Sequence, residues 1–208
     1  MQDKTTLMAV KKFFSYFFIF FLISFAILNS RFVSAYINFW LNEGEIKAAA
    51  VERGKLPKAL PIAESNDFVL EIPSLGVRAP IVLEKSLDPN KIFDRLEDGV
   101  VHYSGSSLPG QKGAAIILGH SSAYPWYKGK YGSVFALLGR LKTGDRIIIN
   151  GGGKTLVYEV KESLIFNPPF KNTGLERLTA ADGSSIILIS CWPVGTNYKR
   201  IAVRADLI

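Results

Sequence analysis

The stretch that decides the fold is "SSIILISCWPVGTNYKRIAVRADLI", residues 184–208. Two apolar runs flank a segment with proline, glycine and asparagine, a pattern that predicts a strand, a turn and a second strand. If the two strands lie side by side, Cys191 at the end of the first lies near Arg200 at the start of the second. Strand alternation places Arg204 on the same face as Arg200 but about 13 Å farther along, at ~3.3 Å per residue. Arg200 is therefore the arginine within reach of Cys191.

The rest of the C-terminal part shows the same short apolar runs separated by turn residues, which predicts a mainly β fold. We expect further strands within residues 68–83, 113–119 and 143–166, the last as a hairpin around Asn-Gly-Gly-Gly. Residues 88–101 predict a short helix, because Asp88 can cap it, Pro89 suits its first turn and Gly99 can end it. Residues 131–141 predict another helical turn. About eight strands with two or three short helices indicate a small β-barrel of mixed topology.

The N-terminal part predicts a membrane anchor. Residues 13–29, "FFSYFFIFFLISFAILN", carry no charge, and their length is at the lower limit for a helix that spans a bilayer. Lys11 and Lys12 precede them and favour a cytoplasmic N-terminus, which places the rest of the chain outside the cell. A cleaved signal peptide is the alternative, because Val33-Ser34-Ala35 offers a cleavage site.

We expect four segments along the chain. Residues 1–12 form the cytoplasmic N-terminus, 13–30 the transmembrane anchor, 31–62 a juxtamembrane linker and 63–208 one domain with its own core. The linker mixes charged residues, alanine and two prolines without a strand pattern. The formal net charge is +7, but the basic residues do not gather in an arginine- or lysine-rich helix. No nucleic-acid partner is therefore expected.

Three residues carry the candidate chemistry. Cys191 is the one cysteine of the chain, which excludes an intramolecular disulfide and a multi-cysteine metal site. His120 follows the predicted strand 113–119 and can meet Cys191 only through the tertiary fold. A thiol beside an imidazole is a recurrent nucleophile, because the thiolate attacks and the histidine handles the leaving-group proton. Arg200 can donate hydrogen bonds to a developing oxyanion without losing its charge. The other histidine, His102, is expected to be structural or on the surface.

These residues resemble the sortase family, the membrane-anchored cysteine transpeptidases of bacterial surfaces. Many members have the form Cys-x-Pro-x-Gly-x-Asn-x-x-Arg, which is matched here by Cys191, Pro193, Gly195, Asn197 and Arg200. The family's histidine region, with a Pro-Gly pair and then Gly-His, is matched by Pro109, Gly110, Gly119 and His120. The resemblance covers residues 66–208. It departs at the Thr-Leu-x-Thr before the cysteine, where this chain has Ile187 and Ser190.

The resemblance implies the eight-stranded sortase-type β-barrel, preceded by the transmembrane helix. It implies cleavage of a Leu-Pro-x-Thr-Gly-like sorting signal between threonine and glycine through a thioester on Cys191. An amine from cell-wall peptide or another surface protein then resolves the thioester. His120 is the implied acid and base, Arg200 the oxyanion or substrate clamp, and Ser190 and Trp192 are candidate substrate contacts. The implied partners are surface proteins that bear the signal, the amine acceptor and the membrane. No cofactor or metal is implied.

Two other functions stay open on the sequence. A cysteine endopeptidase that releases surface proteins by hydrolysis would use the same nucleophile and base. A non-enzymatic, membrane-anchored β-domain would instead bury its cysteine. Within the family, the chain ends directly after the last predicted strand, and no Asp-Pro-aromatic segment precedes the barrel. Both features favour a class D-like or housekeeping enzyme over a pilus-polymerising one.

Overall fold

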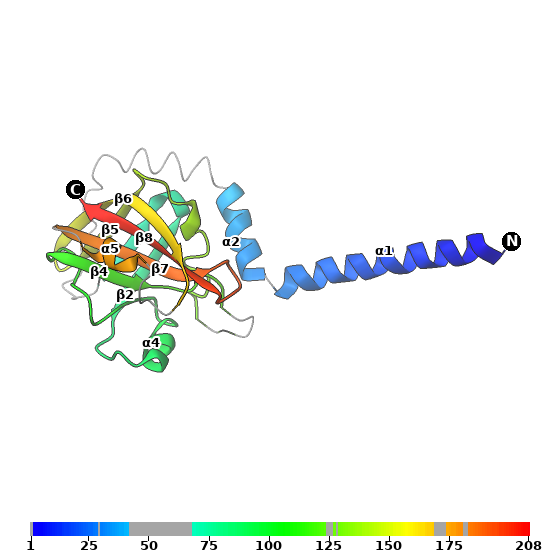
Figure 1. The fold of residues 1–208 in the computed structure, drawn as a ribbon, viewed down its shortest axis with the longest axis horizontal. Coiled ribbons are helices and arrows are strands. Elements are labelled where there is room, and N and C mark those ends of the chain that lie inside the picture. Colours follow the sequence, from blue (N-terminus) through cyan, green and yellow to red (C-terminus); the bar gives the residue numbers. More distant parts are fainter. Residues whose placement is uncertain are drawn as a thin grey trace.

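Eight strands close into a barrel in the order β1-β2-β3-β4-β7-β8-β6-β5 (Figure 1). The computed structural model describes residues 2–28, 30–41, 68–123, 127, 129–168, 174–180 and 183–208. The strands are β1 (Phe68–Ile72), β2 (Val77–Leu83), β3 (Val100–His102), β4 (Gly113–Leu118), β5 (Arg146–Gly151), β6 (Lys154–Phe166), β7 (Ser184–Trp192) and β8 (Lys199–Leu207). The β2–β3 and β4–β7 pairs are parallel and the other pairs are antiparallel. The predicted mainly β barrel of mixed topology is confirmed.

The β5–β6 hairpin is the clearest case of a turn that follows from its residues. The two strands pair up to Gly151 and Lys154, so Gly152 and Gly153 form the turn between them. Both have positive φ, 57° and 73°, a region that glycine enters without steric cost. The glycine-rich stretch therefore closes a hairpin, as the sequence predicts.

The helix predicted for residues 88–101 is correct at its start and wrong at its end. α4 covers Pro89–Arg95, and the Asp88 side chain accepts a hydrogen bond from the Asn90 amide as an N-cap. The chain then turns and enters β3 instead of continuing as a helix. Val100 is fully buried and lies opposite Ile81 of β2, so barrel pairing outweighs helix formation at this point. The region 131–141 contains turns and the short 3-10 helix η2 (Leu138–Arg140).

Side chains of alternate residues separate into two buried clusters on the two faces of the sheet. The inner cluster fills the barrel and includes Leu70, Ile72, Ile117, Phe135, Leu138, Ile147, Ile149, Tyr158, Ile186, Leu188 and Val203. The outer cluster lies on the other face, beneath α5 (Leu175–Thr179), and consists of Ala114, Phe166, Leu178, Ile187, Ile189 and Ala202. Each large apolar side chain buried in this way stabilises the fold by about 1.5–3 kcal/mol. β4, β7 and β8 contribute to both clusters and are thereby fixed on both faces.

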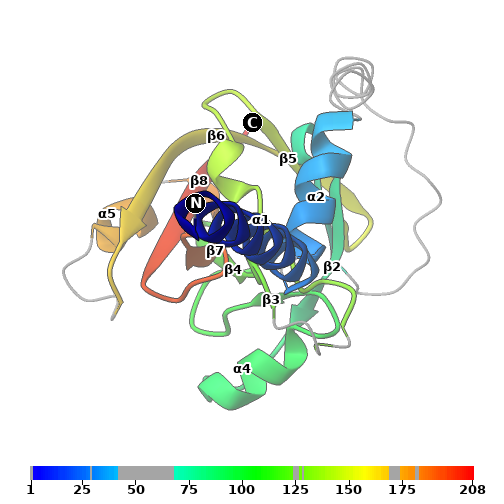
Figure 2. The ribbon, with the colours of Figure 1, turned by 90° about the vertical axis from the view of Figure 1, so that its right-hand side faces the viewer.

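In the described part of the chain, two helices precede the barrel. α1 covers Gln2–Leu28, and within it Met8–Leu28 is long and apolar enough to cross a membrane. α2 (Ser30–Leu41) runs across the direction of α1 and lies beside the barrel (Figures 1 and 2). The Arg140 guanidinium stacks over the Tyr36 ring, 4.9 Å from its centroid, and so connects η2 with α2. The first part of the predicted linker is thus helical, and residues 42–67 lie outside the described part of the chain.

Candidate active site

Strand register brings Cys191 and Arg200 together. Both strands of the β7–β8 pair extend far enough for Cys191 to lie directly opposite Arg200. Residues directly opposite each other in an antiparallel pair have Cβ atoms about 4.5–5.5 Å apart, with side chains on the same face. The turn between them, with Pro193 and Gly195, is short enough to hold this register. The side-by-side arrangement predicted for residues 184–208 is therefore present.

A second register brings His120 to the same place. β4 and β7 are parallel, with Leu118 opposite Ile189. Continuing this register by two residues places His120 beside Cys191. A hydrogen bond holds the ends of the strands together, since the Gly119 amide donates to the Ile189 carbonyl at 3.1 Å. His120, Cys191 and Arg200 thus lie together where β4 and β7 end and β8 begins.

All three residues point away from the barrel interior. On β7, Ile187 and Ile189 belong to the outer cluster, so alternation places Cys191 on the outer face. His120 follows Leu118, which packs against the outer cluster, and Arg200 precedes Ala202, which belongs to it. The candidate site therefore lies on the outside of the barrel, at the end of the apolar surface that α5 covers.

The neighbouring residues Gly119 and Ser190 point inward and hold the site from behind. The Ser190 side chain is 3 % exposed, and its hydroxyl donates to the Gly119 carbonyl at 2.7 Å. A Cβ at Gly119 would lie 2.4 Å from the ring of Phe135, so only glycine fits there. Ser190 therefore faces the opposite side of the sheet from Cys191, and its hydroxyl connects the two strands that carry Cys191 and His120. The substrate contact expected for Ser190 stays a prediction.

His120 is half-buried between two aromatic rings. Its ring lies edge-on to Phe93 of α4, with centroids 5.3 Å apart, and to Tyr127, with centroids 5.1 Å apart. Burial lowers the pKa of His120 below its ordinary value of 6.5, since desolvation disfavours the charged imidazolium. The imidazole is therefore neutral at physiological pH and able to accept a proton.

Arg200 is held by the turn that it closes. Its Nη1 donates to the carbonyls of Asn197, at 3.0 Å, and Lys199, at 2.9 Å. A guanidinium has five N–H donors in a planar fork, so these bonds orient the group and leave other donors for a ligand. Cys191 is a free, half-buried thiol. The three groups together can supply a nucleophile, a proton acceptor and a fixed cation.

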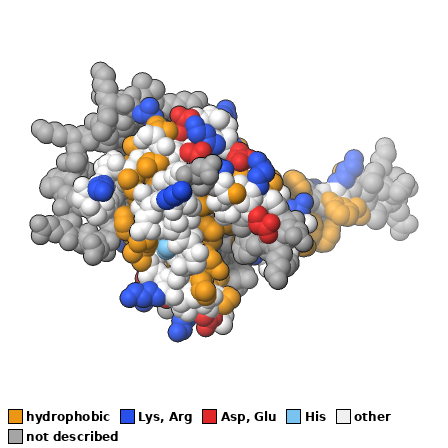
Figure 3. Space-filling model, turned by 60° about the vertical axis from the view of Figure 1, so that its left-hand side comes forward, with side chains coloured by type: hydrophobic (Ala, Val, Ile, Leu, Met, Phe, Trp, Pro, Cys, Tyr) orange, Lys and Arg blue, Asp and Glu red, His pale blue; other side chains and the backbone are white. Residues whose placement is uncertain are grey.

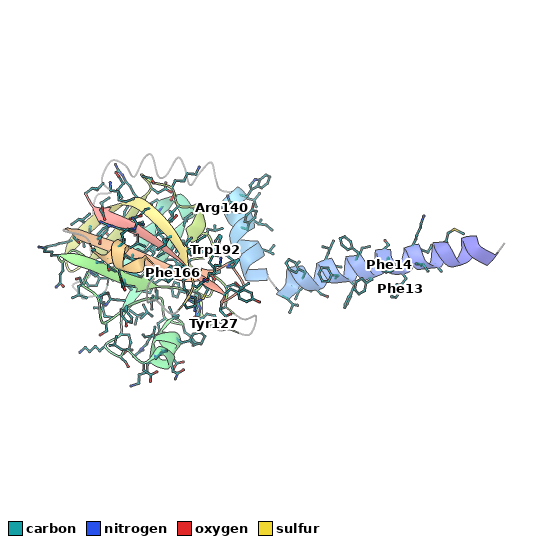
Figure 4. All side chains as sticks on the ribbon, viewed as in Figure 1. Phe13, Phe14, Tyr127, Arg140, Phe166 and Trp192 are labelled. Carbon is teal, nitrogen blue, oxygen red and sulfur yellow. The ribbon has the colours of Figure 1, made fainter. Side chains whose placement is uncertain are left out.

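Trp192 and His102 both make contacts that stabilise the barrel. Trp192 is half-buried and packs against the inner cluster at the end of the barrel beside α2, where Figure 4 labels it near Arg140. His102 is 4 % exposed, and its Nε2 lies 2.8 Å from the Ser107 carbonyl, so it is a structural histidine.

Among the described residues, no group of three or more His, Cys, Asp or Glu side chains could hold a metal ion. Lysine and arginine side chains lie apart on the face drawn in Figure 3.

Sequence reasoning missed the two rings around His120. Phe93 sits on a short helix and is 52 % exposed, so nothing in the sequence marks it as part of a site. Tyr127 lies in the aromatic-rich stretch 124–132, whose composition fits a loop beside a groove and a packed corner equally well. The structure buries Tyr127 and directs its ring at His120.

The protein is thus a closed β-barrel that carries a cysteine, a histidine and an arginine together on its outer face. A family model described as Sortase domain matches residues 70–208, and the chain belongs to the sortase family. This family membership supports the transpeptidases as the class of protein to which the chain belongs. A search of curated proteins finds no match.

Solved structures agree with this assignment. The lid mutant of sortase A from Corynebacterium diphtheriae is 28 % identical, with a TM-score of 0.56 over 71 % of this chain and 73 % of that chain. Sortase C2 of pilus island 1 from Group B Streptococcus is 26 % identical, with a TM-score of 0.56 over 72 % and 77 %. Sortase E1 from Streptomyces coelicolor, solved with a tripeptide in its active site, is 24 % identical over 70 % and 89 %, at a TM-score of 0.56, and shares the fold. These relatives span several sortase types.

Proposed function

We propose that this protein is a membrane-anchored cysteine transpeptidase that cleaves a Leu-Pro-x-Thr-Gly-like sorting signal between threonine and glycine. It then joins the threonine carbonyl to an amine of cell-wall peptide or of another surface protein. The observation that carries the proposal is the convergence of Cys191, His120 and Arg200 at one end of β4, β7 and β8. A half-buried thiol beside a neutral imidazole and a fixed guanidinium supplies the nucleophile, the proton acceptor and the oxyanion donor that acyl transfer needs.

The first half of the reaction forms a thioester. The Cys191 sulfur attacks the threonine carbonyl while the neutral imidazole of His120 takes the thiol proton. Free N–H groups of Arg200 stabilise the negative charge on the carbonyl oxygen of the tetrahedral intermediate. As the carbon–nitrogen bond breaks, His120 returns the proton to the departing glycine amine. The threonine acyl group is then bound to Cys191.

The second half releases the enzyme. The acceptor amine attacks the thioester carbonyl and gives a proton to His120, and the thiolate leaves and is reprotonated. The bond lost at the thioester is replaced by an amide, so neither a cofactor nor an oxidant takes part. Trp192 packs against the inner cluster, on the face opposite Cys191, so in this scheme only its exposed part at the end of β7 is a proposed substrate contact.

The N-terminal segment is the proposed membrane anchor of the enzyme. We propose that residues 13–30 anchor the protein, with residues 1–12 in the cytoplasm and the catalytic domain, residues 63–208, outside the cell. Support comes from the apolar helix segment Met8–Leu28, which meets the length requirement for a span. We assign the class D-like or housekeeping type because the single Asp-Pro pair, Asp88-Pro89, is followed by asparagine and begins α4. An Asp-Pro-aromatic segment is thus missing from the sequence.

One experiment tests the proposal. The full chain in detergent is incubated with a Leu-Pro-x-Thr-Gly peptide library, with and without a glycine-based amine. Mass spectrometry should find cleavage after threonine, an acyl adduct on Cys191 and, when amine is present, the ligated product. Cleavage without ligation at any amine concentration would identify a hydrolytic endopeptidase instead. No adduct and no cleavage with any library member would refute the proposal.

A further inference from the structure

The two rings around His120 come from separate parts of the chain that are fastened to each other. Phe93 belongs to α4, and Tyr127 lies beyond His120 in the chain. The Tyr127 side chain is 9 % exposed, and its hydroxyl donates to the Leu96 carbonyl, just after α4, at 2.7 Å. This hydrogen bond links Tyr127 to the residue that follows α4, so the two rings that contact His120 are connected through it.

α4 itself is fastened to the barrel. Ile92 and Leu96 pack with Val101 of β3 in a third apolar cluster, to which Leu118 of β4 also belongs as a half-buried neighbour. Arg95 pairs with Glu84 at 3.3 Å next to β2. Phe93 follows Ile92 and is turned out of that cluster, half exposed, with its ring against His120.

We propose that Phe93 is a positioning residue for His120. Together with Tyr127 it holds the imidazole between two ring edges, so that the histidine keeps one orientation beside Cys191 and is shielded from water. The inference rests on the proposed function, in which His120 exchanges the proton of Cys191. It goes beyond that function because it gives α4, an element outside the three catalytic strands, a part in the chemistry.

Geometry explains why such a holder is needed. The torsion that turns a histidine ring is broad and nearly two-fold, so the backbone alone does not fix which nitrogen faces a partner. Ring planes at 83° to Phe93 and 80° to Tyr127 restrict that rotation from both sides. His120 Nε2 is buried and has no hydrogen-bond partner within the described residues. The rings thus do the orienting that a hydrogen bond often does for a catalytic histidine.

The electrostatic surroundings point the same way. The titratable and charged residues on the elements around His120 are Tyr127, Cys191 on β7, three on α4 and four on β8: Lys91, Asp94 and Arg95, and Lys199, Arg200, Arg204 and Asp206. None of them is a cause of the lowered pKa of His120, which comes from burial alone. Removing the Phe93 ring admits water to the imidazole and should raise the pKa of His120 toward its ordinary value.

The chain allows a direct test, because it has only two histidines. The full chain, labelled at histidine, is titrated by NMR in micelles as wild type and as Phe93→Ala, Phe93→Tyr and Leu87→Ala. We expect Phe93→Ala to raise the pKa of His120. Its kcat on a sorting-signal peptide should fall about 10- to 100-fold with KM almost unchanged, since orientation and proton transfer are lost together. The acidic limb of its pH–rate profile should move upward with the NMR pKa.

Two variants serve as controls. Phe93→Tyr keeps a ring and should restore the wild-type titration and turnover. Leu87→Ala truncates a side chain that is 56 % exposed, close to the 52 % of Phe93, and should change neither. An unchanged His120 titration and unchanged kcat in folded Phe93→Ala would overturn the inference. If the wild type turns over no peptide, the proposed function fails, while the titration still decides whether Phe93 controls His120.

Discussion

Replacing Arg200 by lysine tests the site most sharply, because it keeps the charge and changes the geometry. In the structure, Nη1 of Arg200 is engaged by the Asn197 and Lys199 carbonyls, which leaves the remaining N–H groups of the fork for the substrate. A lysine ammonium has three donors on a flexible stem. It can satisfy the two carbonyls or reach the oxyanion beside Cys191, but it is not held in a plane for both.

The expected loss follows from the role of one oxyanion donor. Removing such a donor typically costs ~10²–10³ in turnover, or about 2.7–4 kcal/mol of transition-state stabilisation. We expect Arg200→Lys to lower kcat/KM by that factor. The assay is steady-state cleavage of a fluorogenic Leu-Pro-x-Thr-Gly peptide, after thermal melting has shown that the variant is folded.

Arg204→Lys is the matched control. Arg204 shares the face of Arg200 on β8 but lies about 13 Å farther along, and it pairs with Asp206 at 2.9 Å. Its replacement should leave kcat/KM within a few-fold of wild type. Equal and small losses at both positions would refute the assignment of Arg200 to the oxyanion, as would a fully active Arg200→Lys.

The remaining predictions concern the thiol and the histidines. Cys191→Ala should abolish both cleavage and ligation, and leave the melting temperature almost unchanged because the side chain is only half-buried; residual turnover would rule out this nucleophile. His120→Ala should lose nearly all activity. His102→Ala should keep its turnover per folded molecule. It should lose about 1–3 kcal/mol of stability, because a buried partner of the Ser107 carbonyl is removed. The free energy of unfolding should fall as the pH drops below about 6.5, because the unfolded chain binds a proton that buried His120 in the folded chain resists. Denaturant titrations across that pH range should show this slope in the wild type and a shallower one in His120→Ala.

The pairing of Cys191 with Arg200 could be predicted from the sequence because it depends on local rules. A turn of known residues joins two strands, and the two-residue period of a strand then fixes which side chains share a face. The position of Ser190 follows from the same period, since neighbours on a strand point to opposite faces. The inward hydrogen bond from Ser190 to the Gly119 carbonyl is a consequence of this rule.

Other features depend on contacts between distant parts of the chain. β3 has three residues, too few for a periodic signal, and it forms because Val100 and Val101 are buried against β2 and β4. The place of His120 requires the parallel β4–β7 pair, which no local pattern specifies. The contact between Phe93 and His120 requires in addition that α4 packs on β3. Each added layer of tertiary packing takes the contact further from what the sequence alone can show.

The two faces of β7 have different roles, one in the core of the barrel and one at the candidate site. Ile186, Leu188 and Ser190 face inward, where they fill the core and clamp β4, whereas Ile187, Ile189 and Cys191 face outward. The position of Cys191 is therefore fixed by strand pairing and by buried neighbours rather than by the loops around it. Sites held by strands are more precise than sites held by loops.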